Sequence, residues 1–307
     1  MRFLERSLDQ MNQWWKYVLV CACALFLWPA IGSIPLVVAV WINSFPAGEG
    51  MESIVQGNVA GLPVGGLSKN LTLALMLFST VVTLLLTVPL VKALHKRSFS
   101  EVINGTKKIR FGRCLTGVWV WFALMSMMYL ADYLINREDY VLQFDLWRFI
   151  PLVFVSLVFM PFQTTSEEFL FRGYLTQGFA AWTKRRWASL IFPSLIFGLM
   201  HVFNPEVKEF GFWATMPQYV YFGLFFGLVS ILDDGIELAI GIHTANNIFL
   251  SLFATSGSSV LQTDAVLEVV RINPYKDMAL LVVMSIFAGA YFAGKYRWNF
   301  LVLLRRL

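Results

Sequence analysis

The chain has 307 residues, of which 58% are hydrophobic and only 14% are charged, and its mean hydropathy is +0.65. These values exclude an ordinary soluble domain built around a single core. The net charge of +5 would suit a nucleic-acid-binding protein, but Lys and Arg gathered in one set of membrane-flanking loops produce the same excess. We therefore do not expect nucleic acid as a partner.

Long apolar segments recur along the sequence, without the alternating ten-residue segments of a membrane β-barrel. The predicted fold class is all-α, a polytopic membrane bundle of about eight transmembrane helices. The expected spans are 17–42, 71–91, 114–135, 147–163 running on toward 182, 188–203, 217–232, 236–254 and 277–294. The fourth is too long for one straight span, so we expect a bend, or emergence as a surface helix, near Pro161, Gly173 and Gly178.

Lys and Arg are unevenly distributed among the connections. They concentrate in 92–113, in 179–187 and in the tail, whereas 43–70 holds only Lys69. The positive-inside rule therefore predicts an integral membrane protein with both termini cytoplasmic, in the plasma membrane if the source is bacterial. The turn Asp233-Asp234-Gly235 is acidic although it should lie on the cytoplasmic side. The 43–70 loop is interpreted as a plain connector rather than a flexible cover.

The predicted organisation has three parts. Residues 1–146 form the first three helices with their loops, 147–254 form the next four helices, and 255–307 form the last helix and a basic cytoplasmic tail. Cys21, Cys23 and Cys114 show no CxxC spacing, so neither a disulfide framework nor a thiolate metal site is indicated.

Three charges interrupt the apolar core within the stretch QTTSEEFLFRG. An ionised carboxylate in hydrocarbon is costly unless it is compensated, so an intramembrane Glu pair indicates a functional site. Glu168 and Arg172 are four residues apart and can pair on one helical face. Glu167 points about 100° away from Glu168 and remains free for another role.

Two of the three histidines also fall in apolar spans. His201 ends the fifth span, and His243 lies one turn before Asn247 in the seventh. Counting about 1.5 Å per residue from the basic turn places Glu167 and His201 at the same depth, roughly 22–26 Å. The same count gives only roughly 14 Å for His243, so an unequal loop or a tilt must make up the difference.

These groups together could perform hydrolysis. A carboxylate can take a proton from water, an imidazole can orient that water, and an amide with a second imidazole can stabilise an oxyanion. Singly, the same residues would suit a salt-bridged helix end, interhelical hydrogen bonds or a transporter's proton relay. Glu167, His201 and His243 could also bind a divalent metal such as zinc, although the HExxH signature is missing.

The motifs Glu167-Glu168-x-x-x-Arg172, Phe197-x-x-x-His201 and His243-x-x-x-Asn247 follow one another in order. They resemble the three signature motifs of the CPBP intramembrane proteases, a family that includes the CAAX prenyl endopeptidases and the bacterial bacteriocin-processing and immunity proteins, also called Abi. The resemblance covers about residues 147–254.

The resemblance implies an intramembrane endopeptidase whose site opens toward the cytoplasm. Glu167 would activate the water together with His201. His243 and Asn247 would stabilise the oxyanion, and the pair of Glu168 and Arg172 would support the site. The family is commonly labelled as metalloproteases, but no cofactor is assured here. The expected partners are the bilayer and a membrane-embedded or lipidated, CAAX-like polypeptide substrate, and the alternative is a non-proteolytic bacteriocin self-immunity or adaptor protein.

Overall fold

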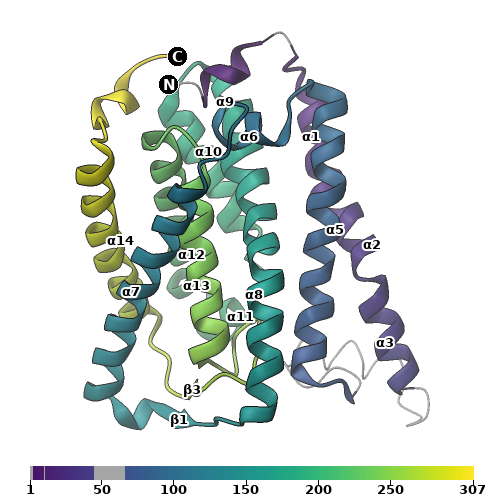
Figure 1. Cartoon of the computed structure of the whole chain (residues 1–307), viewed down its shortest axis with the longest axis vertical. Coiled ribbons are helices and arrows are strands. Elements are labelled where there is room, and N and C mark those ends of the chain that lie inside the picture. Colours follow the sequence, from purple (N-terminus) through teal and green to yellow (C-terminus); the bar gives the residue numbers. More distant parts are fainter. Residues whose placement is uncertain (1–2, 10, 45–65) are drawn as a thin grey trace.

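The computed structural model describes residues 3–9, 11–44 and 66–307. These residues form an upright bundle of helices (Figure 1), which confirms the predicted all-α membrane fold. Six of the described helical segments are long and apolar enough to cross a membrane: Trp14–Asn43, Lys69–His95, Phe111–Ile135, Leu146–Thr183, Phe212–Leu232 and Pro274–Tyr296. The other two expected spans are also helical, but shorter.

The elements carry the following bounds. The first half contains η1 (Glu5–Leu8), α1 (Trp14–Ala22), the π-helical η2 (Cys23–Leu27), α2 (Trp28–Gly32), α3 (Ile34–Ser44), α5 (Lys69–His95), α6 (Phe99–Asn104), α7 (Phe111–Ile135), η5 (Arg137–Asp139) and β1 (Tyr140–Leu142). The second half contains α8 (Leu146–Glu168), the π-helical η6 (Phe169–Leu175), α9 (Thr176–Thr183), α10 (Arg186–Leu199), α11 (Pro205–Phe210), α12 (Phe212–Leu232), α13 (Glu237–Phe253), β2 (Ala254–Thr255), β3 (Leu267–Val269), α14 (Pro274–Tyr296) and η7 (Phe300–Leu304).

The centre of the bundle is α13, which packs against α7, α8 and α12. Glycines permit the closest approaches, because a Cβ at Gly241 would collide with the Cys114 carbonyl of α7. A Cβ at Gly223 would lie 2.7 Å from the Ser194 carbonyl oxygen of α10, and a Cβ at Gly227 would meet the side chain of Leu190. The Gly223-x-x-x-Gly227 pattern of α12 is therefore a close helix contact, as small residues at this spacing indicate.

The two ends of the bundle differ. Both termini and α6 lie at one end, called here the terminal end, and β1 and β3 lie at the other, the sheet end (Figure 1). At the sheet end, β1 pairs antiparallel with β3, with Tyr140 opposite Val269, and β2 pairs parallel with β3. The predicted 43–70 connector lies largely outside the described residues.

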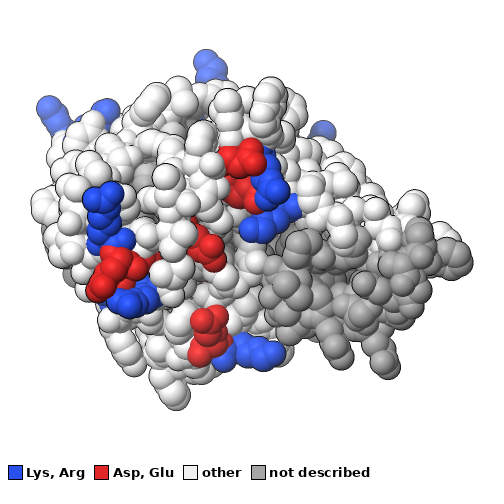
Figure 2. Space-filling view, turned by 90° about the horizontal axis from the view of Figure 1, so that it is seen from below, with Lys and Arg blue, Asp and Glu red and all other residues white. Residues whose placement is uncertain are grey.

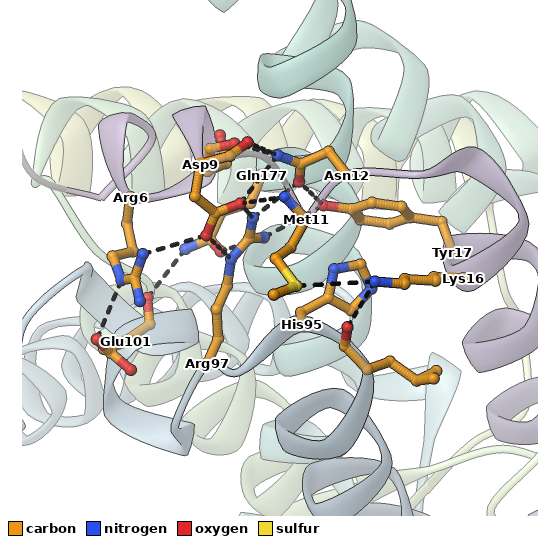
Figure 3. A network of polar contacts seen from close by, with 12 residues as sticks. Arg6, Asp9, Met11, Asn12, Lys16, Tyr17, His95, Arg97, Glu101 and Gln177 are labelled. Carbon is orange, nitrogen blue, oxygen red and sulfur yellow. Dashed lines mark hydrogen bonds and ion pairs between the residues drawn. The ribbon is translucent and has the colours of Figure 1, made fainter.

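The terminal end is closed by a hydrophobic cluster and a buried polar network. Phe3 and Tyr17 of the N-terminal segment pack with Phe169 of η6 in the cluster. In the network (Figure 3), the fully buried Arg97 guanidinium donates to the Asp9 carboxylate at 2.8 Å. Burial works to raise the pKa of Asp9, but the hydrogen bond and charge of Arg97 outweigh it and hold that pKa below its ordinary value.

The acidic turn that conflicted with the charge rule has basic partners. Asp233 pairs with Arg113 at 2.9 Å and with Arg110 at 3.4 Å, and Arg110 also binds Glu237 at the start of α13. Despite these partners, burial raises the pKa of Asp233 to about 6. Since the turn is buried beneath the 92–113 loop, α13 starts below the surface, and a short helical count suffices for His243 to reach the level of Glu167.

The long fourth span is one continuous helical segment from Leu146 to Thr183. The chain continues from α8 through the π-helical turn η6 into α9, which ends at Thr183. Gly173 and Gly178 are packing sites, because a Cβ on them would collide with Val102 and Tyr17 respectively. The alternative of a surface helix was wrong, since all of η6 and most of α9 are buried.

Candidate active site

A cavity of about 650 Å³ lies inside the bundle, and Glu167, His201, His243 and Asn247 all contribute to its wall. They come from three different parts of the fold: the end of α8, the turn after α10, and the middle of α13. The structure thus brings together the four residues predicted as catalytic, including His243, whose depth was the weakest part of the prediction.

Glu168 and Arg172 form the buried ion pair that their spacing predicts. Arg172 Nη1 donates to Glu168 Oε1 at 3.1 Å, and the two side chains are 1% and 0% exposed. The guanidinium also lies over the Phe197 ring, 3.9 Å from its centroid. A buried charge is tolerated only with such compensation, because an unpaired one costs several kcal/mol.

His243 joins this ion pair to the cavity. Its Nδ1 lies 2.8 Å from Glu168 Oε1, a contact that the sequence analysis did not anticipate. With Glu168 ionised beside Arg172, Nδ1 is the donor, an assignment made from the hydrogen-bond partners. The other ring nitrogen, Nε2, faces Glu167 Oε2 at 3.7 Å, which is too far for a direct hydrogen bond. The Phe226 ring stacks on this imidazole at 5.1 Å between centroids.

Glu167 is the carboxylate that meets the cavity, with 30% of its side chain exposed. The Gln163 amide, one helical turn earlier, donates to Glu167 Oε1 at 2.5 Å and accepts from Asn247 Nδ2 at 2.9 Å. Gln163 therefore bridges the two helices that carry Glu167 and Asn247. Sequence reasoning missed this role, and the available signal was the spacing of four residues between Gln163 and Glu167.

The Asn247 amide has a defined orientation. Its oxygen accepts from Asn246 Nδ2 at 3.2 Å, and the Asn246 oxygen accepts in turn from Trp121 Nε1 at 3.2 Å. One Asn247 N–H is committed to Gln163, and no described side chain takes the second. That second N–H is available to a bound ligand.

His201 is held from two sides. Its Nδ1 lies 2.8 Å from the Phe197 carbonyl oxygen, and because a carbonyl oxygen can only accept a hydrogen bond, Nδ1 is the donor. In the neutral ring Nε2 is then an acceptor. Tyr219 of α12 stacks on the imidazole, with centroids 4.3 Å apart and planes at 20°, and its hydroxyl accepts from Asn204 Nδ2 at 3.0 Å. No motif in the sequence would have identified Tyr219.

The donor set does not fit a preformed metal site. Within the described part of the chain, no three His, Cys, Asp or Glu side chains converge closely enough to hold an ion. Glu167, His201 and His243 line one cavity but are not arranged as ligands of a common centre. Metal dependence stays a prediction.

The cavity extends from Glu167 toward the sheet end. Its wall there includes Ser256, Val260, Arg271 and Lys276, which follow α13 or begin α14. The motif resemblance implied a site open toward the cytoplasm. The side of the membrane to which the cavity opens stays a prediction.

Three comparisons with known proteins bear on this site. The family described as type II CAAX prenyl endopeptidase Rce1-like matches residues 146–249, the segment that carries every predicted site residue. The YyaK protein of Bacillus subtilis (strain 168), named as uncharacterized, is 34% identical over 202 residues, covering 65% of this chain and 67% of that protein. No solved structure matches the chain significantly.

Proposed function

Because the chain belongs to the type II CAAX prenyl endopeptidase Rce1-like family, we propose that it is an intramembrane endopeptidase that cleaves a membrane-associated polypeptide with water activated by Glu167. One observation carries the proposal. A half-buried carboxylate, two imidazoles and an oriented amide face one cavity, while the second carboxylate is neutralised behind them. This is the set of groups that hydrolysis with water as the nucleophile requires.

Hydrolysis begins with the Glu167 carboxylate, which takes a proton from water while the water oxygen bonds to the scissile carbonyl carbon. His201 accepts a hydrogen bond from that water at Nε2, because its Nδ1 is committed to the Phe197 carbonyl. Gln163 holds the carboxylate through its other oxygen, Oε1, and so fixes its orientation toward the cavity.

The oxyanion forms beside His243 and Asn247. The Glu168 carboxylate accepts from Nδ1 and orients the His243 ring, and Nε2 donates to the oxyanion when that nitrogen carries a proton. The uncommitted Asn247 N–H supplies a second donor. When the intermediate collapses, the C–N bond breaks and Glu167 returns its proton to the leaving nitrogen, which yields a carboxylate and an amine.

Turnover by purified protein tests this proposal. Wild type and Glu167→Gln should be compared on libraries of prenylated and unmodified peptides. Loss of the general base should lower kcat about 10²–10⁴-fold, with little effect on folding, since the two side chains are nearly isosteric. Equal turnover by the two proteins would refute the proposal and favour a non-proteolytic immunity or adaptor role.

Metal dependence needs its own measurement. We expect activity to persist after dialysis against a chelator. Stoichiometric zinc in active protein purified without chelator, lost in His201→Ala, would instead establish a metalloprotease.

A further inference from the structure

The direction in which His201 Nε2 points depends on more than its hydrogen bond. The bond from Nδ1 to the Phe197 carbonyl fixes one ring atom, but the imidazole could still pivot about it. The stacked ring of Tyr219, 4.3 Å away between centroids and only 20° from parallel, fixes the plane of the imidazole. The two contacts together determine where Nε2 points.

Close packing of α10 against α12 sets the height of Tyr219 beside His201. Gly198 lies three residues before His201, and Val220 follows Tyr219 directly. A Cβ at Gly198 would lie 2.6 Å from Val220 Cγ2, so the two helices touch next to the stacked pair. Because close-packed helices cannot slide freely past each other, the tyrosine ring is a rigid support for the imidazole.

The Tyr219 hydroxyl is tied to the turn that carries His201. Asn204 begins α11, and its backbone N–H donates to the His201 carbonyl at 3.0 Å. An Asn at this position usually caps its helix by accepting from backbone N–H groups, but this side chain makes no capping bond. Its Nδ2 instead donates to the Tyr219 hydroxyl at 3.0 Å.

A carboxylate lies next to this hydroxyl and connects it to a loop of the cavity wall. The hydroxyl oxygen accepts from Asn204, so its proton is free for Glu206, with which Tyr219 interacts. Glu206 Oε1 also accepts from the Val260 backbone N–H at 3.2 Å. Burial raises the pKa of Glu206, and the hydrogen bonds from Val260 and Tyr219 oppose that rise. Contacts therefore run from the loop between β2 and β3, residues 256–266, to His201.

Glu206 is not one half of a surface ion pair. The sheet-end face of the bundle bears acidic and basic side chains in small mixed groups (Figure 2). Glu206 differs, because none of the Lys and Arg side chains that the structure describes pairs with it, and both of its donors are neutral. A partly buried carboxylate without a cationic partner costs free energy. Its place in the cavity wall therefore needs a reason other than charge pairing.

We propose that Tyr219 is a positioning residue that aims His201 Nε2 at the attacking water, and that Glu206 couples this pair to the loop between β2 and β3. The inference rests on the proposed endopeptidase function and adds the residues that set its geometry. Tyr219 and Glu206 act through His201, so a substrate that displaces the loop alters the orientation of the imidazole.

Turnover of a peptide that the wild type cleaves tests the role of Tyr219. Tyr219→Leu removes the stacked ring and should lower kcat by about 10²-fold, the loss that follows from a misplacement of about 1 Å, while KM stays close to that of the wild type. Tyr219→Phe keeps the ring and loses one hydrogen bond, so kcat should fall only about 2- to 12-fold. Wild-type kcat in Tyr219→Leu overturns the positioning role.

A double-mutant cycle tests the coupling through Glu206. Glu206→Met removes the carboxylate and should lower kcat about as much as Tyr219→Phe does. Combined, the two substitutions should lower kcat no further than Tyr219→Phe alone, because they break the same contact. Glu209→Met, which removes an exposed carboxylate from the same short helix, is the matched control and should keep the wild-type kcat. Losses that multiply in the double variant, or an equal loss in the control, overturn the coupling.

Histidine NMR tests the geometry without using activity. The chain has three histidines, so protein with ¹³C-labelled histidine in detergent gives few ring signals, and that of His201 is identified by its loss in His201→Ala. The ring current of the stacked tyrosine moves this signal upfield. We expect Tyr219→Phe to keep the upfield position and Tyr219→Leu to abolish it, with the His95 and His243 signals in place as evidence of an intact fold. An unmoved His201 signal in Tyr219→Leu overturns the inference.

The same measurement still decides if Tyr219→Leu does not fold. Glu206→Met should then shift the His201 signal in the wild-type background but not in Tyr219→Phe, and the absence of any shift in the wild-type background contradicts the coupling.

The two proposals fail separately. Equal turnover by wild type and Glu167→Gln refutes the endopeptidase, whatever the NMR signals show. Turnover that requires Glu167 but is unaffected by Tyr219→Leu refutes only the positioning role.

Discussion

Gln163→Met isolates the contribution of the bridge between Glu167 and Asn247. Methionine nearly conserves the volume of a side chain that is only 9% exposed, but it removes the donor to Glu167 and the acceptor for Asn247. A hydrogen bond to a charged group contributes about 1.5–3 kcal/mol. If that energy is used to hold the carboxylate in its reactive orientation, kcat should fall about 10- to 150-fold, at about 1.4 kcal/mol for each tenfold.

The assay measures kcat and KM on an internally quenched, unmodified peptide that the wild type cleaves, alongside the thermal midpoint. Thr164→Val is the matched control. Its hydroxyl lies 2.6 Å from that of Thr244, so the substitution removes a buried hydrogen bond between the same two helices without touching Glu167 or Asn247. We expect the control to lose stability but to keep its kcat. Wild-type kcat in Gln163→Met, or an equal loss in Thr164→Val, would contradict a positioning role for Gln163.

Three further predictions concern stability, measured as unfolding in detergent. Arg172→Met leaves Glu168 buried without its ion-pair partner and should lower the unfolding free energy by about 3–5 kcal/mol, whereas an unchanged midpoint would contradict the pairing. Gly241→Ala should cost about 1–3 kcal/mol, because its Cβ collides with the backbone of α7, whereas Gly289→Ala, with nothing within 4 Å of its Cβ, should not destabilise. The reverse ranking would refute that packing argument. Since the pKa of Asp233 is raised from 3.8 to about 6 in the folded protein, the native state binds the extra proton, so stability should fall as pH rises through this window. In Asp233→Asn, the thermal midpoint should no longer show this part of its fall with rising pH between about 4 and 6. An unchanged dependence of the midpoint on pH would contradict the assignment to Asp233.

The residues of the site could be predicted because each is anomalous in its local sequence. Glu167, Glu168, His201 and His243 are polar groups in apolar segments, and helical periodicity alone pairs Glu168 with Arg172. Their partners could not be predicted in the same way. The contact between His243 and Glu168 joins residues that are 75 positions apart. The spacing of residues within one helix does not show which face of a neighbouring helix those residues contact.

Composition and periodicity by themselves determined the class of fold, the helical segments and the polar residues that must be buried, because hydrocarbon imposes the same cost on every polar group that enters it. Only the tertiary structure decided how these groups meet. It placed the start of α13 beneath the 92–113 loop, so that His243 reaches Glu167 despite its short count. It also closed the terminal end and left the cavity running to the sheet end, since the packing of the N-terminal segment against η6 is a long-range contact that no local pattern encodes.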